Sequence, residues 1–440
     1  MRRFTWGILA ASLIAAWSAT GPATAALHGA LAIHCGQLFD GVSEALVGPR
    51  WVTIRDGRIA SIETTRPAAG IPALDLSHLT CLPGLIDLHT HLTDSPEDTK
   101  DLKVYFTRSD AEALRLAEEH AQATLQAGFT TVRDVGTYIA WADQRLHGEI
   151  EAGRALGPRM QYAGFYLTIP GGGGDLLLPG MKEADIPRRL RMGVARGADA
   201  FRARAEAAVA GGATLLKVIA SGAVLAYGGV PGAPEMTEAE IRAVAEVAHR
   251  HGLRLAAHAH GAQSVKDSLR AGADTIEHAS LIDDEGIALA KAKGVCLDMD
   301  VWNGDSIATE GKRQGWPEEF LRKNLETTEI QRQNFTKALR AGAILGYATD
   351  AAVYPHGENA RQFRIMVERG MTPLQAIRSA TSVAARCMGW EDRVGALRPG
   401  LNGDLVAVDG DPLQDVTRLE HVVAVVRGGD VVKAPAPARP

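Results

Sequence analysis

The sequence predicts an α/β protein with a (β/α)8 barrel, also called a TIM barrel, and a small β-sandwich domain built from both chain ends. Three features carry this prediction. Eight short apolar runs alternate with long amphipathic stretches, both ends hold short strand-like runs, and several amphipathic stretches end in Ala-Gly. Eight β-then-α units are the number that a parallel barrel needs. An open doubly wound sheet is the alternative, although it does not require eight units.

The first residues predict a secretory signal peptide over residues 1–25. Arg2 and Arg3 precede an apolar run at 6–17 that is too short to cross a membrane, and Ala-Thr-Ala at 23–25 is a small-x-small cleavage pattern. Cleavage is expected after Ala25 or Ala26, which implies a periplasmic or secreted protein. No later stretch reaches 18 uninterrupted apolar residues, so we expect no membrane contact after cleavage.

Both ends of the mature chain predict β-structure, and we assign residues 26–82 and 394–440 to the sandwich. Strands are expected at 31–35, 51–54, 58–62, 404–408 and 422–427. Asp56-Gly57 is typical of a tight hairpin turn between two of them.

The middle of the chain, residues 83–393, predicts the barrel. Its eight strands are expected at 84–89, 130–134, 160–163, 215–220, 253–258, 275–278, 295–299 and 344–349. Helices are expected at 111–127, 201–210, 238–251 and 324–341, among others. Gly128, Gly211, Gly272 and Gly342 follow helical stretches, where a left-handed C-cap favours glycine.

Charge and cysteine content limit the function classes. The 440 residues hold 47 basic and 52 acidic side chains, so a strongly basic nucleic-acid binder is excluded. The four cysteines (Cys35, Cys81, Cys296 and Cys387) are far apart and form no CxxC pair, which argues against a zinc finger and a disulfide scaffold. One disulfide between Cys35 and Cys81, or four free buried thiols, are the alternatives.

Polar groups stand at five of the eight predicted strands, at the end where the catalytic groups of such barrels lie. They are His89 and His91 at the first strand, Lys217 in the fourth, His258 and His260 at the fifth, Glu277-His278 at the sixth and Thr349-Asp350 at the eighth. Each alone has an ordinary explanation, such as a hydrogen-bonded core histidine. Their joint position at strand ends indicates a site.

This donor set predicts two divalent metal ions. Imidazole nitrogens and carboxylate oxygens suit Zn²⁺, with Mn, Co and Fe as alternatives. The histidines and the aspartate around Lys217 are too many for a single tetrahedral ion. An ammonium between two cations would be repelled, whereas a lysine carbamate formed with CO₂ is an anion whose two oxygens can bridge them.

These motifs resemble the amidohydrolase superfamily, in its imidazolonepropionase-related branch. The resemblance spans nearly the whole mature chain and rests on 83–91 (PGLIDLHTH), Lys217, His258, His278, 348–350 (ATD) and 397–405 (LRPGLNGDL). Two further runs, 217–234 and 347–357, are similar to secreted bacterial metallo-dipeptidases of the Xaa-Pro type and to ochratoxin amidohydrolases.

The resemblance implies a role for each site residue. The implied ligands are His89, His91 and Asp350 for one ion, and His258 and His278 for the other, with carbamylated Lys217 as the bridge. Asp350 is also expected to move a proton from the attacking water to the leaving nitrogen. Tyr227 and His260 are candidates to hydrogen-bond the substrate carbonyl or the oxyanion, with a supporting role in the pocket wall as the alternative.

The predicted function is a secreted amidohydrolase that releases a C-terminal amino acid from dipeptides or N-acyl amino acids. Ochratoxin A is the most specific candidate substrate, and the fold implies an even-numbered homo-oligomer. An Xaa-Pro dipeptidase, a cyclic-amide or lactone hydrolase and a non-catalytic binding protein are the alternatives. The loop at 170–175 (PGGGGD) lacks the histidine that related dipeptidases often use for the substrate carboxylate, which favours a wider entrance.

Overall fold

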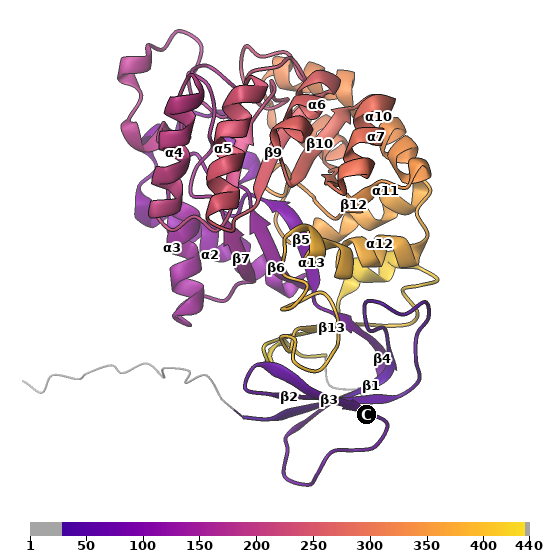
Figure 1. The fold of residues 1–440 in the computed structure, drawn as a ribbon. Coiled ribbons are helices and arrows are strands. Elements are labelled where there is room, and N and C mark those ends of the chain that lie inside the picture. Colours follow the sequence, from indigo (N-terminus) through magenta and orange to yellow (C-terminus); the bar gives the residue numbers. More distant parts are fainter. Residues whose placement is uncertain (1–28, 436–440) are drawn as a thin grey trace, which may run out of the picture.

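A computed structural model describes residues 29–435, and they form an α/β fold with two parallel sheets and a third, mostly antiparallel sheet. Figure 1 shows a large body of helices and parallel strands, with the third sheet at one end of it. The predicted signal peptide, residues 1–25, lies outside the described residues. Among residues 29–435, no helix is both long and apolar enough to cross a membrane.

The third sheet has seven strands and combines both ends of the chain. Its order is β15-β14-β13-β4-β1-β2-β3. The strands are β1 (Leu31–Leu38), β2 (Arg50–Arg55), β3 (Arg58–Glu63), β4 (Ala73–Pro83), β13 (Leu405–Val408), β14 (Ala424–Arg427) and β15 (Asp430–Lys433). Asp56 and Gly57 both have positive φ, 51° and 77°, as a two-residue hairpin turn requires.

All eight strands predicted for the middle of the chain are present, and their paired neighbours run parallel. One sheet has the order β5-β6-β7 and the other the order β12-β11-β10-β9-β8. The strands are β5 (Leu85–Thr90), β6 (Phe129–Asp134), β7 (Arg159–Tyr162), β8 (Leu216–Ile219), β9 (Leu255–Gly261), β10 (Thr275–Leu281), β11 (Cys296–Asp298) and β12 (Ile344–Gly346).

Backbone hydrogen bonds connect the two parallel sheets at both of their edges. At one edge, Asp350 N donates to His89 O at 2.8 Å, which ties the segment after β12 to β5. At the other edge, Leu167 N donates to Lys217 O and Ile219 N donates to Leu167 O, both at 2.9 Å. The segment after β7 therefore lies against β8, and the eight strands share one continuous backbone network.

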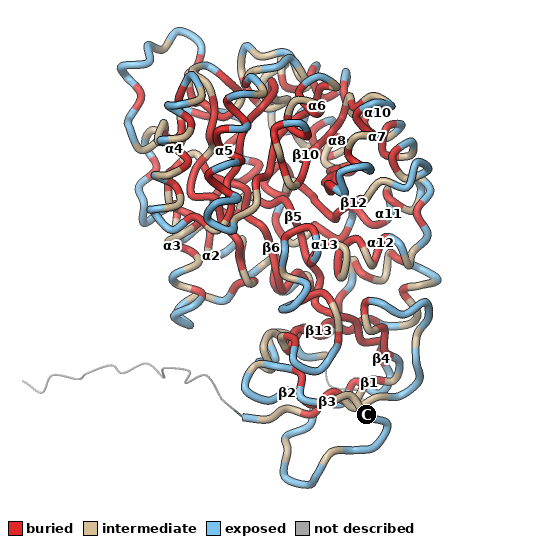
Figure 2. Tube along the Cα trace, viewed as in Figure 1, coloured by how far each residue is buried: buried red, intermediate tan, exposed pale blue. Residues whose placement is uncertain are grey.

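Helices lie around the parallel strands (Figure 1). The parallel strands themselves are buried along almost their whole length, whereas the exposed segments lie in the outer helices and loops (Figure 2). The α-helices are α1 (Val104–Thr107), α2 (Asp110–Gln126), α3 (Ala142–Glu151), α4 (Ala198–Ala210), α5 (Glu238–Arg250), α6 (Ala262–Ala271), α7 (Asp284–Lys293), α8 (Asn303–Ser306), α9 (Lys312–Gln314), α10 (Glu318–Ala341), α11 (Gln362–Glu368), α12 (Pro373–Ser379) and α13 (Ser382–Cys387). Shorter 3₁₀ or π segments are η1 (Pro96–Lys100), η2 (Glu183–Asp185), η3 (Arg188–Leu190), η4 (Ile307–Gly311), η5 (Asn359–Arg361) and η6 (Val416–His421).

The glycines that end the helices match the prediction at three of four positions. Gly128, Gly272 and Gly342 have φ of 101°, 104° and 74°, in the left-handed region that glycine enters without a steric cost. Gly211 was expected to do the same after α4, but its φ is −77°. The next residue, Gly212, makes the left-handed turn with φ of 97°, so α4 is capped one residue later than predicted.

Two disulfides join elements that are distant in sequence. Cys35 of β1 pairs with Cys81 of β4, and this bond was one of the two alternatives for the cysteines. Cys296 of β11 pairs with Cys387 of α13, a bond that the sequence did not predict. The alternative of four free thiols is therefore wrong, because the Cα atoms of each pair lie 5.8 or 6.0 Å apart, within bonding geometry.

Candidate metal centre

The polar groups predicted at the strand ends meet in one cavity of about 150 Å³. They come from β5, β8, β9, β10 and the segment after β12. Seven of the predicted site residues line this cavity: His89, His91, Lys217, His258, His260, His278 and Asp350. Parallel strands deliver these residues to one place because their carboxyl ends share one edge of the sheet.

One group of donors surrounds the Asp350 carboxylate. Its Oδ1 lies 3.4 Å from His89 Nε2 and 3.3 Å from His91 Nε2. Donor atoms of His89, His278 and Asp350 also lie within 4.8 Å of one another. The three residues predicted for the first ion are therefore adjacent, and their atoms are those that a divalent ion prefers.

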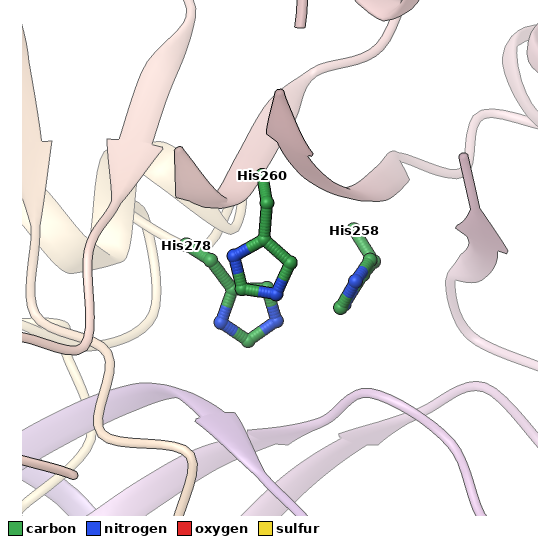
Figure 3. Close-up of side chains that lie close together, drawn as sticks. All are labelled: His258, His260 and His278. Atoms are coloured by element: carbon green, nitrogen blue, oxygen red, sulfur yellow. The ribbon is translucent and has the colours of Figure 1, made fainter. Parts of the chain in front are cut away.

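A second group consists of His258, His260 and His278, whose donor atoms lie within 4.8 Å of one another (Figure 3). Their ring centroids are 4.5 to 4.6 Å apart, and the rings of His260 and His278 are stacked. His278 belongs to both groups and so connects them. His260, predicted to contact the substrate, is placed as close to its neighbours as the two predicted ligands are.

The Nδ1 atom of four of these histidines contacts a partner behind the cavity. The pairs are His89 with Glu277 at 2.8 Å, His91 with the Gly136 carbonyl at 2.8 Å, His278 with Asp300 at 3.0 Å and His260 with Ser280 Oγ at 2.9 Å. The carboxylates and the carbonyl can only accept, so each of those three imidazoles donates from Nδ1. This places the lone pair on Nε2, the atom that then faces the cavity and can bind a metal.

Lys217 lies at the centre of this arrangement without a partner. Its side chain is 1% exposed, and Nζ makes no hydrogen bond. Burial lowers the pKa of its amine to about 8. His258 Nε2 is also buried and unbonded, and burial lowers the pKa of that imidazole well below its usual value. Because an unpaired buried polar atom is costly, these orphaned atoms fit a site that a metal ion and a lysine carbamate complete.

Burial and neighbouring charges set the protonation of the other side chains at the site. Burial lowers the pKa of His89 to about 3, which keeps this imidazole neutral as a metal ligand requires. Burial also opposes the ionisation of Asp350, but the neighbouring imidazoles outweigh it and hold the pKa of this carboxyl well below its usual value. In the same way, Asp350 outweighs burial at His91 and raises its pKa to about 9. An ion that binds at His91 therefore displaces a proton.

A buried ionic cluster lies behind the site, and the sequence did not predict it. Arg133 of β6 donates to Glu277 at 2.8 Å and to Asp298 at 2.7 Å, and all three side chains are buried. The other carboxylate oxygen of Glu277 accepts from His89. The argument applied to Lys217, a charged residue within an apolar strand, would also have found Arg133.

Two segments that carry predicted ligands adopt backbone conformations that are unusual for their residues. His278 and Asp350 have φ of 68° and 58°, and Ala279 has φ of 46°. Left-handed conformations at residues other than glycine cost about 1–3 kcal/mol each and often occur at functional sites. The surrounding structure therefore holds two of the predicted ligands in a backbone conformation that these residue types do not favour.

Tyr227, the candidate for a substrate contact or for a supporting role in the pocket wall, lies outside the cavity lining. Its ring packs against Phe320 with centroids 4.9 Å apart, and it is absent from the described residues that line the cavity. Tyr166 takes a position closer to the site, because its hydroxyl lies 3.2 Å from His91 Nδ1 and it lines the cavity. Tyr166 follows the third predicted strand, and this position could have predicted its place at the site.

The loop at 170–175 borders the cavity through Gly173 and Gly174. Gly173 N donates to the Glu235 carboxylate at 2.8 Å, and Gly171 N donates to Asp175 at 2.9 Å. These backbone donors are therefore used within the protein, so they do not replace the histidine that the sequence lacks here.

Known proteins that are similar to this chain include hydrolases. Ochratoxinase from Aspergillus niger is 29% identical over 424 residues, covering 92% of this chain and 86% of that protein. A solved Xaa-Pro dipeptidase with bound methionine in the active site is 31% identical, with a TM-score of 0.85 over 92% of this chain and 99% of that one. A prolidase complexed with N-methylphosphonate-L-proline is 28% identical, with a TM-score of 0.86 over 92% of this chain and all of the other.

A parallel α/β fold with histidines and an aspartate at its strand ends defines a class of hydrolases that are typically metal-dependent. The chain belongs to the Amidohydrolase family, which matches residues 80–432. It is therefore an enzyme that hydrolyses amide bonds, as the sequence predicted.

Proposed function

We propose that this enzyme cleaves the amide bond to a C-terminal amino acid in dipeptides or N-acyl amino acids, with ochratoxin A as one candidate substrate. The observation that carries the proposal is the pair of donor groups that share His278 beside the unpartnered Lys217. The relatives support the substrate class, because they include an Xaa-Pro dipeptidase, a prolidase and ochratoxinase.

The proposed cofactors are two divalent ions, with Zn²⁺ as the expected metal. The proposed ligands are His89, His91 and Asp350 for one ion, His258 and His278 for the other, and a carbamate on Lys217 between them. When bound, such ions polarise the substrate carbonyl and lower the pKa of water towards neutrality. Every proposed ligand lines the same cavity, which supports this assignment.

Asp350 is proposed as the group that moves the proton. Its Oδ1 faces His89 and His91, and its Oδ2 lies 3.4 Å from Asn303 Nδ2. A carboxylate restrained in this way can accept the proton of the attacking water and deliver it to the leaving nitrogen. His260 is proposed to donate from Nε2 to the substrate carbonyl oxygen, provided that Ser280 then donates to its Nδ1.

The finer architecture is also a proposal. We infer that the eight parallel strands close as a barrel within residues 83–393, supported by the hydrogen bonds that join both edges of the two sheets. We infer that residues 26–82 and 394–440 form a β-sandwich, supported by a common apolar core. That core includes Ile33, Val52, Leu76, Leu405 and Val426.

We further propose that the enzyme is periplasmic or secreted and assembles as a homo-oligomer. The two disulfides support the location, because such bonds persist in oxidising compartments. Its partner is a small-molecule amide, and we expect no binding to nucleic acid or, after signal cleavage, to membranes.

A release assay tests the proposed function. Zinc-loaded enzyme would be mixed separately with Xaa-Pro dipeptides, other dipeptides, N-acyl amino acids, ochratoxin A, lactones and cyclic ureides, and the products identified by mass spectrometry. We expect a free C-terminal amino acid from at least one linear amide, and a loss of at least about 100-fold in Asp350→Asn. Turnover of lactones or cyclic ureides alone would contradict the proposal.

A further inference from the structure

Carboxylates outnumber lysines and arginines among the described side chains that line the cavity. Its lining includes Asp94, Asp300 and Asp350, whereas no arginine occurs among the described lining residues and the one lysine is Lys217. Asp300 accepts from His278 and Gln331, and Asp350 lies against two imidazoles. Asp94 is the one of these three carboxylates that accepts no hydrogen bond from an imidazole or a side-chain amide within the described residues.

Asp94 lies on the segment between β5 and α1, and it is only 7% exposed. The nearby Arg108 makes no hydrogen bond to it, because this guanidinium forms a two-bond pair with Asp98. Thr93 Oγ1 lies 3.3 Å from Asp94 Oδ1, but the same hydroxyl makes a shorter bond of 2.8 Å to Thr137. Within residues 29–435, Asp94 forms no ion pair with a lysine or an arginine.

Tyrosine rings form the cavity wall beside Asp94. The centroids of Tyr105 and Tyr138 are 4.9 Å apart, and those of Tyr138 and Tyr166 are 5.2 Å apart. Tyr166 then approaches His91, with centroids 5.9 Å apart. Burial raises the pKa of Asp94 to about 7, although His91 and a hydrogen bond from Tyr105 favour its ionised form. The ionised carboxylate acts on all three tyrosines, so the carboxylate and the rings belong to one surface that leads to the metal centre.

We propose that Asp94 and this tyrosine wall receive a positively charged group of the substrate. A buried carboxylate without a cation is costly, and an ammonium or guanidinium would supply the missing charge. Electron-rich ring faces attract the same groups. The cation is either the free α-amino group of a dipeptide or a basic side chain, and Asp94 is then a specificity-determining residue. This inference rests on the proposed function and narrows it towards cationic substrates.

Two pairs of substrates distinguish the sources of the cation. Ala-Phe is compared with N-acetyl-Ala-Phe for the amino group, and N-acetyl-Ala-Lys with N-acetyl-Ala-norleucine for the side chain. In the wild type we expect kcat/KM to be at least about tenfold higher for the cationic member of one pair. Asp94→Asn should reduce that ratio to about threefold or less. Asp101→Asn, a matched change on the same segment outside the cavity lining, should leave the ratio unchanged.

Equal kcat/KM within both pairs of the wild type would overturn the inference. An equal loss on both members in Asp94→Asn would also overturn it, because Asp94 would then only support the structure. Tyr138→Leu gives a second test, since loss of a ring face should reduce the ratio about two- to fivefold without a change in charge.

A binding measurement separates this inference from the proposed function. Calorimetry on the zinc-loaded full chain would compare phenylalaninamide, a cation, with neutral N-acetylphenylalaninamide. Tighter binding of the cation, lost in Asp94→Asn, would support the inference even if the release assay detected no product, in which case the proposed function alone would fail. Equal binding of the two amides would overturn the inference even if dipeptides were hydrolysed.

Discussion

The histidines of the cavity are oriented by groups that lie behind them. Glu277 and Asp300 accept from the Nδ1 atoms of His89 and His278, and each bond turns Nε2 towards the cavity. Asp300 follows directly after the predicted strand at 295–299, and Glu277 precedes a predicted ligand. Their residue types and places were visible in the sequence, but their pairing with particular histidines depends on the arrangement of neighbouring strands.

His260 lies close enough to His258 and His278 to bind a metal ion, although we propose that it contacts the substrate. We predict that His260→Ala lowers kcat about 100-fold, because a hydrogen-bond donor to the developing oxyanion is lost. Both zinc ions should remain, because His258, His278 and the Lys217 carbamate still hold the second one. Elemental analysis and kinetics on the same preparation check this prediction. Loss of one ion per chain would assign His260 to the metal instead.

We predict that Lys217 makes metal uptake dependent on pH. Its amine has a pKa lowered to about 8, and only the neutral amine reacts with CO₂. The neutral fraction is roughly a tenth at pH 7 and half at pH 8, so carbamate formation and zinc uptake should rise as pH increases from 6 to 9. The measurement is zinc bound by metal-free enzyme in bicarbonate buffer at each pH.

The control for this prediction is Lys217→Glu, which carries a carboxylate without CO₂. Zinc uptake by this variant should not respond to bicarbonate, whereas uptake by the wild type should. A wild type that binds zinc equally well with and without bicarbonate would contradict the carbamate.

At the scale of elements, the sequence predicted most strands of the fold but not all of their lengths. β9 and β10 extend to Gly261 and Leu281, beyond the predicted ends at 258 and 278. The apolar runs stop at the histidines, so the pattern could not show that the strands continue through the site. β4 was missed because its first half is largely exposed and has no continuous apolar run.

The disulfide between β11 and α13 should stabilise the fold. Cys296 and Cys387 are 91 residues apart, so their bond restricts a long loop of the unfolded chain. We predict that Cys296→Ala combined with Cys387→Ala lowers the free energy of unfolding by about 2–4 kcal/mol. Urea unfolding of this variant and of Cys35→Ala/Cys81→Ala, which opens a loop of 46 residues, compares the two bonds. An unchanged transition midpoint would show that the bond between β11 and α13 does not contribute.

At the scale of the whole molecule, the alternation of short apolar runs with amphipathic stretches predicted the eight parallel strands. Polar residues at the ends of these strands predicted the site. Lys217, for example, was notable because an ammonium within a buried strand is costly. Tyr227 shows what such patterns cannot predict. It lies in a long loop, where no periodicity fixes the direction of a side chain, and the structure packs it on Phe320.

A count of bound metal ions tests the proposed binuclear centre with its bridge at Lys217. Wild-type enzyme loaded with zinc in bicarbonate buffer should hold two ions per chain, and Lys217→Ala should hold at most one. Glu391→Gln, an exposed change in the same fold, serves as the control and should keep both. One ion or none in the wild type, or two ions in Lys217→Ala with full activity, would contradict the account.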